Sequence, residues 1–482
     1  MMKSAAAFGG VLLALLCAGT ASAAPGWLPA TTLGSGAKGN ECPAQVALDA
    51  QGDATAAWTT AEGVQLATKP AAGGWQLATT IAFGSPACIQ DVVSNQRGDS
   101  VAVWERFDGT RVRDEASVHP AGGSWSVPIV IEEGPKGSSE VMPARAALDL
   151  KGDVLVVYRQ SGTGDIGGRF YEAGTGAWGF GFGITAPVKS NYGLGVAMDA
   201  TGNAVVVWER VESGKETVEA TYLPLYAFPV TPRTEAISAE AAEVPSNAPV
   251  VAMNGGGEAV AAFAHVGGGT TTIQATTMHP GGTWQLAETI SVTGEAAQRP
   301  LLGLDPYGNV VALWEHPTGK ETVIQATSRT VNAAWTLPVS ISENGQTATS
   351  PALSVDGSGD AVAAWRSGAG TVVQSARRTA GGPWQSPATL SSPGASAPSV
   401  SLDARGDALA MWEVEGASRE VQAAGYAANG PALGPVSIPT SGKVGETLTM
   451  TGAASDLWTT FTQTWSFGDG SEGTGGKVTH VY

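Results

Sequence analysis

Charged side chains and one histidine follow an aromatic residue that recurs about every 50 residues along the chain. Arginines, histidines and carboxylates gathered at one opening can bind polar ligands, and a pair of carboxylates can act as acid and base. In two repeats the equivalent position is occupied by an uncharged residue, Thr59 or Ala264. The simpler explanation of these charged residues is that they lie on ordinary solvated hairpins. The candidate binding residues are Glu105, Arg106, Arg159, Glu209, Arg210, Glu315, His316, Arg366 and Glu413.

The chain shows no other motif for catalysis or metal binding. It lacks an H-E-x-x-H motif, and its five histidines have no paired metal-ligand spacing. Turn aspartates such as Asp49 and Asp53 are candidate calcium ligands, but their recurrence in every repeat fits turn capping better. We therefore predict no catalytic residue, no metal and no cofactor.

A repeated turn must position the candidate residues. The repeat reads Asp or Asn, two residues, Gly, an acidic or amide residue and, five residues later, an aromatic residue. In such a hairpin the Asx side chain bonds its own backbone, and the glycine adopts a positive φ angle. Eight copies, spaced 46 to 55 residues apart, centre on Gly52, Gly98, Gly152, Gly202, Gly257, Gly308, Gly359 and Gly406.

Four short strands fit into each repeat, which is the size of a propeller blade. A glycine turn leads to a tryptophan-led fourth strand, as at Gly73-Gly74-Trp75, but the last repeat lacks this strand. An unmatched strand at Trp27 lies at the other end of the chain and would complete the last blade. We predict an all-β fold, an eight-bladed β-propeller of four-stranded blades over residues 24–430, closed by the N-terminal strand. An open all-β solenoid is the alternative.

Cys42 and Cys88 occupy the same position in adjacent repeats, ten residues before the turn glycine. Both therefore begin the innermost strand of neighbouring blades, where two Cα atoms can approach within the range of a disulfide. An even pair of cysteines is typical of exported proteins with a disulfide. We predict a Cys42–Cys88 disulfide, with two buried thiols as the alternative.

Residues 1–23 are typical of a secretory signal peptide. Lys3 precedes an apolar run at 11–18, and Ala21-Ser22-Ala23 offers small residues for cleavage. The alternative is a membrane anchor, but the apolar run is too short to span a bilayer. We expect a secreted or cell-surface protein that has no membrane span after cleavage and is a monomer. The net charge of −17 argues against nucleic-acid binding.

Residues 431–482 depart from the repeat. Trp465-Ser466-Phe467-Gly468-Asp469-Gly470 and His480-Val481-Tyr482 resemble the W-x-F-G-D-G and H-x-Y signatures of the polycystic kidney disease (PKD) domain. That resemblance implies a partial immunoglobulin-like β-sandwich, because further strands follow H-x-Y in the family. It also implies a bacterial exported protein in which this module is a spacer or a contact for protein or carbohydrate.

Two functions fit the sequence. Most of the 15 tryptophans lie at two repeat positions, so the architecture uses them and none is left as a stacking platform for a ligand. The leading hypothesis is a non-enzymatic scaffold that binds an extracellular protein or polysaccharide. The alternative is a polysaccharide-active enzyme, a glycosidase or lyase, at the mouth of the propeller channel. Two carboxylates facing each other within about 5 to 10 Å would favour the enzyme.

Overall fold

The computed structural model describes most of the chain beyond residue 24. The predicted signal peptide, 1–23, and the predicted boundary at 430 and 431 lie outside the described residues. No helix occurs in the described part, and so none there is long and apolar enough to cross a membrane. The described ranges are 25–38, 42–71, 73–84, 86–135, 143–161, 163–185, 191–224, 232–242, 248–416, 418–428, 432–439, 442–443, 445–455 and 463–482.

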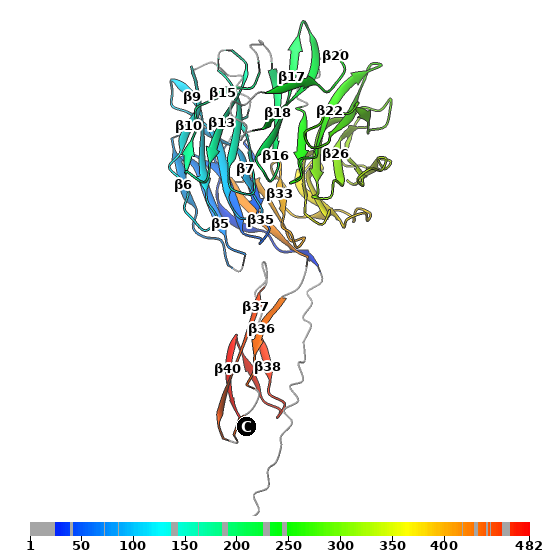
Figure 1. Ribbon diagram of the computed structural model, residues 1–482. Coiled ribbons are helices and arrows are strands. Elements are labelled where there is room, and N and C mark those ends of the chain that lie inside the picture. Colours follow the sequence, from blue (N-terminus) through cyan, green and yellow to red (C-terminus); the bar gives the residue numbers. More distant parts are fainter. Residues whose placement is uncertain are drawn as a thin grey trace, which may run out of the picture. The chain divides into compact units, whose positions relative to one another are not determined.

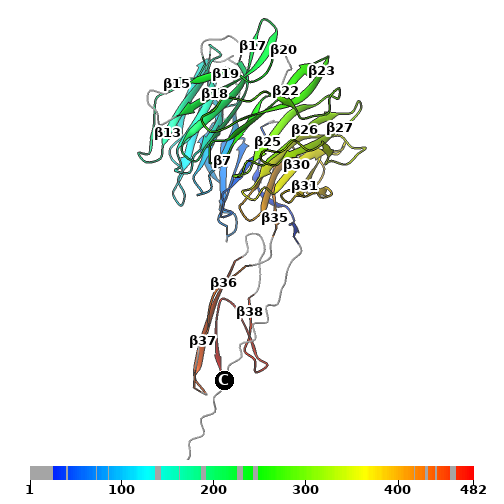
Figure 2. The same cartoon turned by 45° about the vertical axis from the view of Figure 1, so that its right-hand side comes forward.

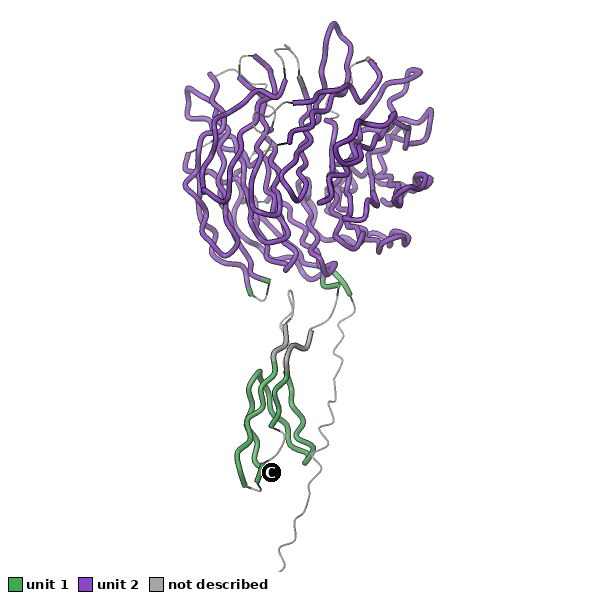
Figure 3. Tube along the Cα trace, viewed as in Figure 1, with its two compact units in different colours: residues 1–26, 71–73, 427–482 green, residues 27–70, 74–426 purple. Residues whose placement is uncertain are grey.

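The chain forms two compact units (Figure 3). The larger unit spans 27–70 and 74–426. The smaller unit collects 427–482 together with short segments from earlier in the chain.

The described part of the larger unit contains eight antiparallel sheets, here numbered in chain order, with four strands in the main path of each. Sheet 1 contains β3 (Gln45–Leu48), β4 (Ala54–Thr60), β5 (Gly63–Lys69) and β6 (Thr79–Phe83). Sheet 2 contains β7 (Ala87–Ser94), β8 (Ser100–Phe107), β9 (Arg111–His119) and β10 (Ile129–Pro135). Sheet 3 contains β11 (Arg145–Leu148), β12 (Val154–Arg159), β13 (Ile166–Glu172), β14 (Ala177–Trp178) and β15 (Phe182–Gly183). Sheet 4 contains β16 (Asn191–Met198), β17 (Asn203–Glu212), β18 (Lys215–Pro224), β19 (Arg233–Ala236) and β20 (Ala241–Ala242).

The other four sheets follow the same plan. Sheet 5 contains β21 (Val250–Met253), β22 (Ala259–Gly267), β23 (Thr270–Met278) and β24 (Glu288–Thr289). Sheet 6 contains β25 (Gln298–Leu304), β26 (Val310–Pro317), β27 (Thr322–Arg329) and β28 (Val339–Ser340). Sheet 7 contains β29 (Ala348–Val355), β30 (Ala361–Ser367), β31 (Val372–Arg378) and β32 (Ala388–Thr389). Sheet 8 contains β33 (Ser399–Leu402), β34 (Ala408–Val414), β35 (Glu420–Ala427), β1 (Gly26–Trp27) and β2 (Thr31–Ser35).

The first strand of each sheet packs against the first strand of the next (Figures 1 and 2). The series returns to its start, because β33 also packs against β3. At this junction the Val46 and Leu48 amides donate to the Ser399 and Ser401 hydroxyls over 3.2 and 3.0 Å. This arrangement of sheets is a β-propeller.

Sheet 8 takes its outer strand from the other end of the chain. β1 pairs with β35, and beside it the Leu28 amide donates to the Gly425 carbonyl over 2.8 Å. The Trp27 ring lies 5.5 Å from the Tyr426 ring. The N-terminal segment thereby supplies the fourth strand of the main path of sheet 8.

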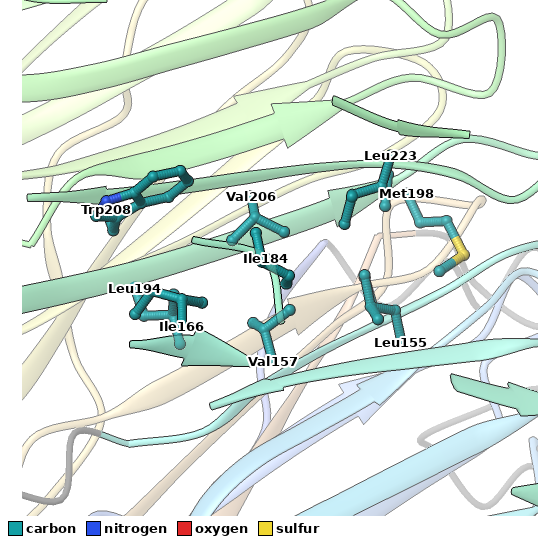
Figure 4. Close-up of a cluster of buried hydrophobic side chains, with 11 residues drawn as sticks. Leu155, Val157, Ile166, Ile184, Leu194, Met198, Val206, Trp208 and Leu223 are labelled. Atoms are coloured by element: carbon teal, nitrogen blue, oxygen red, sulfur yellow. The ribbon is translucent and has the colours of Figure 1, made fainter. Parts of the chain in front are cut away.

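Buried side chains from neighbouring sheets fill the space between them. Between sheets 3 and 4, Leu155, Val157 and Ile166 pack against Leu194 and Trp208 (Figure 4). Alternating β-branched and aromatic residues suit such half-buried pleated surfaces. The tryptophans near the ends of the second strands are all fully buried, namely Trp58, Trp104, Trp208, Trp314, Trp365 and Trp412.

The repeated turn is an Asx turn, as the sequence predicts. Asp49 Oδ1 accepts the amides of Gln51 and Asp53, both over 2.8 Å, and each later sheet repeats this pair of bonds. The turn glycine is favoured in each copy of the repeat by its positive φ angle, and at Gly98 also by close packing. Gly98 has φ 91°, and a Cβ there would lie 2.8 Å from Asp49 Oδ2 of the preceding sheet.

In the smaller unit, β36 (Ala432–Ser437), β37 (Thr447–Ser455) and β40 (Lys477–Val481) form one sheet, and β38 (Thr464–Ser466) pairs with β39 (Glu472–Thr474). The residues of the PKD-like motifs contact one another. His480 Nε2 lies 2.7 Å from Asp469 Oδ2, and the His480 ring stacks on Phe467 at 4.1 Å. The motif therefore has a structural role in holding these strands together.

Candidate functional site

All nine candidate residues lie toward the end of a second strand, on β8, β12, β17, β26, β30 or β34. These strand ends are opposite to the Asx turns, which begin the same strands. The nine side chains are therefore at the same end of their sheets. Their partners decide which of them is available to a ligand.

Two of the arginines are neutralised within their own sheets. Arg106 pairs with Glu115, and its Nε lies 3.0 Å from Glu115 Oε2. Arg210 Nη1 lies 3.1 Å from Glu219 Oε1. Both glutamates lie on third strands, opposite the buried tryptophan of the second strand. Sequence reasoning missed them, although both stand eleven residues after that tryptophan.

Glu413 and His316 are also engaged within the protein. Arg419 Nη2 lies 2.6 Å from Glu413 Oε2, and both residues are buried. Burial raises the pKa of Glu413 to about 7, although the charge of Arg419 opposes this shift. His316 Nδ1 donates a hydrogen bond to the Ala296 carbonyl oxygen over 2.7 Å.

Glu315 joins sheets 6 and 7. It is 1% exposed and accepts from Gln298 Nε2 over 3.0 Å and from Arg299 Nη1 over 3.3 Å. It also accepts the Ser350 amide of the next sheet over 2.8 Å. Ser350 has φ 53°, which is uncommon for a residue other than glycine. Glu315 therefore positions backbone and is not open to a ligand.

The remaining three candidates differ from one another. Glu209 is buried. The Arg159 guanidinium lies over the Tyr192 ring, 5.8 Å from its centre. Arg366 lines a cavity of about 580 Å³ with Glu321, Gly345, Gln346, Thr347, Thr349, Gly368, Ala369 and Thr371.

Sheet 2 carries a row of three carboxylates that the sequence analysis did not bring together. Glu105 on β8 lies directly opposite Asp114 on β9, and Asp114 lies opposite Glu132 on β10. Directly opposed residues share one face of a sheet, with Cβ atoms about 4.5 to 5.5 Å apart. We call Glu105, Asp114 and Glu132 the acidic row. Only Glu105 carried a sequence signal, because the other two lie outside the repeated motif.

Asp114 has the most perturbed environment in the acidic row. It is 3% exposed, and its Oδ1 has no hydrogen-bond partner in the described part of the chain. Burial, with the charges of Glu105 and Glu132, raises the pKa of Asp114 to about 8. Burial also raises the pKa of Glu105 and of Glu132, which are both partly exposed. Asp114 is therefore protonated at neutral pH beside two carboxyl groups that reach solvent.

Sheet 3 departs from the repeat next to the acidic row. Tyr158 replaces the usual tryptophan, and Gly167 lies opposite it where sheets 2 and 4 have a glutamate. A Cβ at Gly167 would lie 2.9 Å from the Tyr158 ring. Burial and the charge of Glu132 raise the pKa of Tyr158 to about 12. The Ser161 amide, also from sheet 3, donates to Glu132 Oε1 over 3.2 Å.

The acidic row has the elements of a general acid and base pair. A carboxylic acid kept protonated by its surroundings, next to a carboxylate of lower pKa, is the arrangement by which proteins assign these two roles. In the described residues no group of three or more His, Cys, Asp or Glu side chains is placed to hold a metal ion.

The predicted disulfide is confirmed. Cys42 and Cys88 are bonded, with their Cα atoms 5.6 Å apart. The bond joins sheets 1 and 2 at the end where the candidate residues lie, since Cys88 pairs with Glu105 across β7 and β8.

Comparison with known proteins gives matches in structure only. A scan against protein-family models finds no match, and a search of curated protein sequences finds none. Among solved structures, the chain is similar to an α-L-arabinanase of Penicillium chrysogenum, at 11% identity and TM-score 0.39, over 60% of this chain and 93% of that one. A polysaccharide lyase acting on ulvan matches at 10% identity and TM-score 0.41, over 82% and 95%. A fucose-specific lectin of Aleuria aurantia matches at 14% identity and TM-score 0.37, over 61% and 91%. At these values the likeness assigns no activity.

Proposed function

We propose that this propeller is an extracellular polysaccharide-active enzyme, a glycosidase or lyase, whose acid and base are in the acidic row. This was the alternative hypothesis from the sequence. The observation that carries it is Asp114, a carboxyl group whose pKa is raised to about 8 between two partly exposed carboxyl groups. Catalytic acids are tuned in this way by burial and by like charges.

The three residues of the acidic row have different roles in this proposal. Because Asp114 is buried, its proton reaches the glycosidic oxygen by way of the partly exposed Glu105, as the bond from that oxygen to the sugar carbon breaks. Glu132, which accepts the Ser161 amide, is the carboxylate that attacks the sugar carbon or activates water. Until the proton is transferred, Glu105 keeps it on Asp114 through its negative charge.

The test is an assay of product release from a panel of neutral and acidic polysaccharides. Asp114→Asn and Glu132→Gln should each lower turnover at least a hundredfold, in line with general acid–base contributions of about 10² to 10⁴. Glu420→Gln, at an exposed position on β35, is the control and should retain full turnover. A lack of turnover by the wild-type protein across the panel would contradict the proposal.

The same proposal includes the finer architecture. We infer that the eight sheets are the eight blades of a propeller closed by the N-terminal strand, supported by the contact of β33 with β3 and the pairing of β1 with β35. We further propose a cleaved signal peptide at 1–23, a propeller over 24–430 and a PKD-like spacer over 431–482. We also propose secretion, with which the disulfide accords, and a monomeric state.

A non-enzymatic polysaccharide-binding protein is the second candidate. The observation that favours it is the internal pairing of most candidate residues, which leaves the cavity at Arg366 as a site without evident acid–base chemistry. Binding on a glycan array without any product release would support this candidate over the enzyme.

A further inference from the structure

We propose that the cavity beside Arg366 binds the carboxylate of an acidic sugar residue, such as a uronate within a polysaccharide. This inference rests on the proposed action on polysaccharides and names the substrate class. The cavity lies between sheets 6 and 7, at the end of the propeller that carries the candidate residues, and has a volume of about 580 Å³. This volume lies within the range of small-molecule sites.

Arg366 is the anchor of the cavity. Its Nε is buried and has no hydrogen-bond partner among the described residues. The Nε atoms of Arg210 and Arg419 are also without a partner, but these two arginines and Arg106 each form an ion pair with a carboxylate of this chain. Arg366 forms no ion pair with a carboxylate among the described residues. A buried donor without a partner is costly, and a carboxylate can satisfy a guanidinium through two parallel bonds. A guanidinium that lines a cavity without a carboxylate partner therefore favours an anionic ligand that brings its own carboxylate.

The walls of the cavity fit the hydroxyl groups of a sugar. Thr347, Thr349 and Thr371 supply hydroxyl groups, each able to donate and to accept. Gln346 and Glu321 complete the polar lining from the loops of sheets 6 and 7. Glu321 is an acidic residue and would repel the carboxylate of the ligand, which is therefore expected to bind at Arg366. Glu321 would instead accept a hydrogen bond from a sugar hydroxyl group.

The backbone around the cavity is held in uncommon conformations. Thr371, in the wall, has φ 50°, and Ser350, next to Thr349, has φ 53°. Such values are uncommon for residues other than glycine, most of all for a β-branched residue such as Thr371, and persist only where surrounding structure enforces them. At Ser350 that structure is Glu315, which accepts its amide. The cavity is thus shaped before any ligand arrives.

The binding test uses free sugars with the whole protein. Isothermal titration with glucuronate and galacturonate should show saturable binding, at least tenfold tighter than with glucose and galactose. Arg366→Gln should weaken uronate binding at least tenfold, and Arg366→Lys should weaken it less. Arg97→Gln, an exposed arginine at the opposite, Asx-turn end of the sheets, is the control and should leave the affinity unchanged.

A second variant guards against misfolding at Arg366. Thr371→Gly suits the positive φ and removes one wall hydroxyl, so it should fold and bind uronate several-fold more weakly. Equal binding of neutral sugars and uronates, or unchanged affinity in the folded Arg366→Gln protein, would overturn the inference. The Asp114→Asn variant separates the two proposals, because it should lose turnover but still bind uronates at the cavity. If the wild-type protein binds uronates but shows no turnover, only the proposed enzymatic function is contradicted. If it turns over neutral glycans but binds no uronate, only the proposed uronate site is contradicted.

Discussion

Arg419 and Glu413 form a buried ion pair in sheet 8, with Nη2 and Oε2 2.6 Å apart and exposures of 6% and 2%. Glu413 shared the strand position of Glu105, but the two carboxyl groups have different surroundings. Glu413 forms an ion pair with an arginine, whereas Glu105 lies opposite Asp114, another acidic residue. The same repeat position is therefore structural in one sheet and a candidate for chemistry in another.

Removing the arginine of this pair should destabilise the protein more at high pH. Because burial raises the pKa of Glu413 to about 7, this carboxyl is mostly protonated at pH 6 and mostly ionised at pH 8. In Arg419→Gln the charge that lowers the pKa of Glu413 is lost, so at pH 8 this buried carboxyl must either give up its ionisation or stay charged without a partner, and breaking such a pair typically costs about 3 to 5 kcal/mol. Urea unfolding should show a larger loss at pH 8 than at pH 6. An equal loss at both values would mean that the pair does not act through charge.

Asp114→Asn should flatten the pH dependence of stability. The folded-state pKa of Asp114 is raised to about 8, whereas the unfolded carboxyl ionises near pH 4. At this group the folded protein therefore binds more protons between these values, so the contribution of Asp114 to stability falls as pH rises from about 4 to 8 and then levels off. Asparagine cannot ionise, so Asp114→Asn should lose this slope and melt higher than the wild type at pH 8. Thermal melts across pH 4 to 9, with Glu420→Gln as control, would test this.

The same variant separates function from structure. A catalytic acid held in a costly environment should give a protein that is more stable and less active when replaced. If Asp114→Asn were less stable at pH 8, the row would instead be a structural network.

Loss of the disulfide should weaken the junction of sheets 1 and 2. The bond closes a loop with a sequence separation of 46 residues, for which the chain-entropy model gives about 4 kcal/mol. The double variant Cys42→Ser with Cys88→Ser should therefore unfold at lower denaturant concentration than the oxidised wild type. Reduced wild-type protein should match the variant, and a mismatch would show that serine itself causes the change.

Gly98→Ala should be more harmful than Gly122→Ala. Both glycines have positive φ, 91° and 67°, so alanine strains the backbone at each. Only at Gly98 would the new Cβ also meet a neighbour, Asp49 Oδ2 at 2.8 Å, since nothing lies within 4 Å of a Cβ at Gly122. We expect a loss of about 1 kcal/mol at Gly122 and a clearly larger one at Gly98. Equal losses in denaturant titrations would argue that close packing between sheets is unimportant there.

Much of the propeller could be predicted because its signals are local and repeated. The Asx turns, the buried tryptophans and the disulfide follow from residue types at constant spacing, such as Cys42 and Cys88 ten residues before their glycines. The place of Trp27 in sheet 8 follows from counting tryptophan-led strands. Each depends on hydrogen bonds and packing within one repeat or between adjacent repeats.

The acidic row and the cavity at Arg366 depend on tertiary structure. Glu132 lies 27 residues from Glu105 in the chain, and only the register of β8, β9 and β10 places both beside Asp114. Whether a charged residue is neutralised is likewise decided by partners outside the motif, as with Arg106 and Glu115. By itself the sequence determined the repeated sheets and the covalent link between two of them. Which carboxyl groups hold protons, and whether an arginine such as Arg366 finds a carboxylate partner among the described residues, were decided only by folding, because burial and through-space charge depend on strands that are distant in the chain.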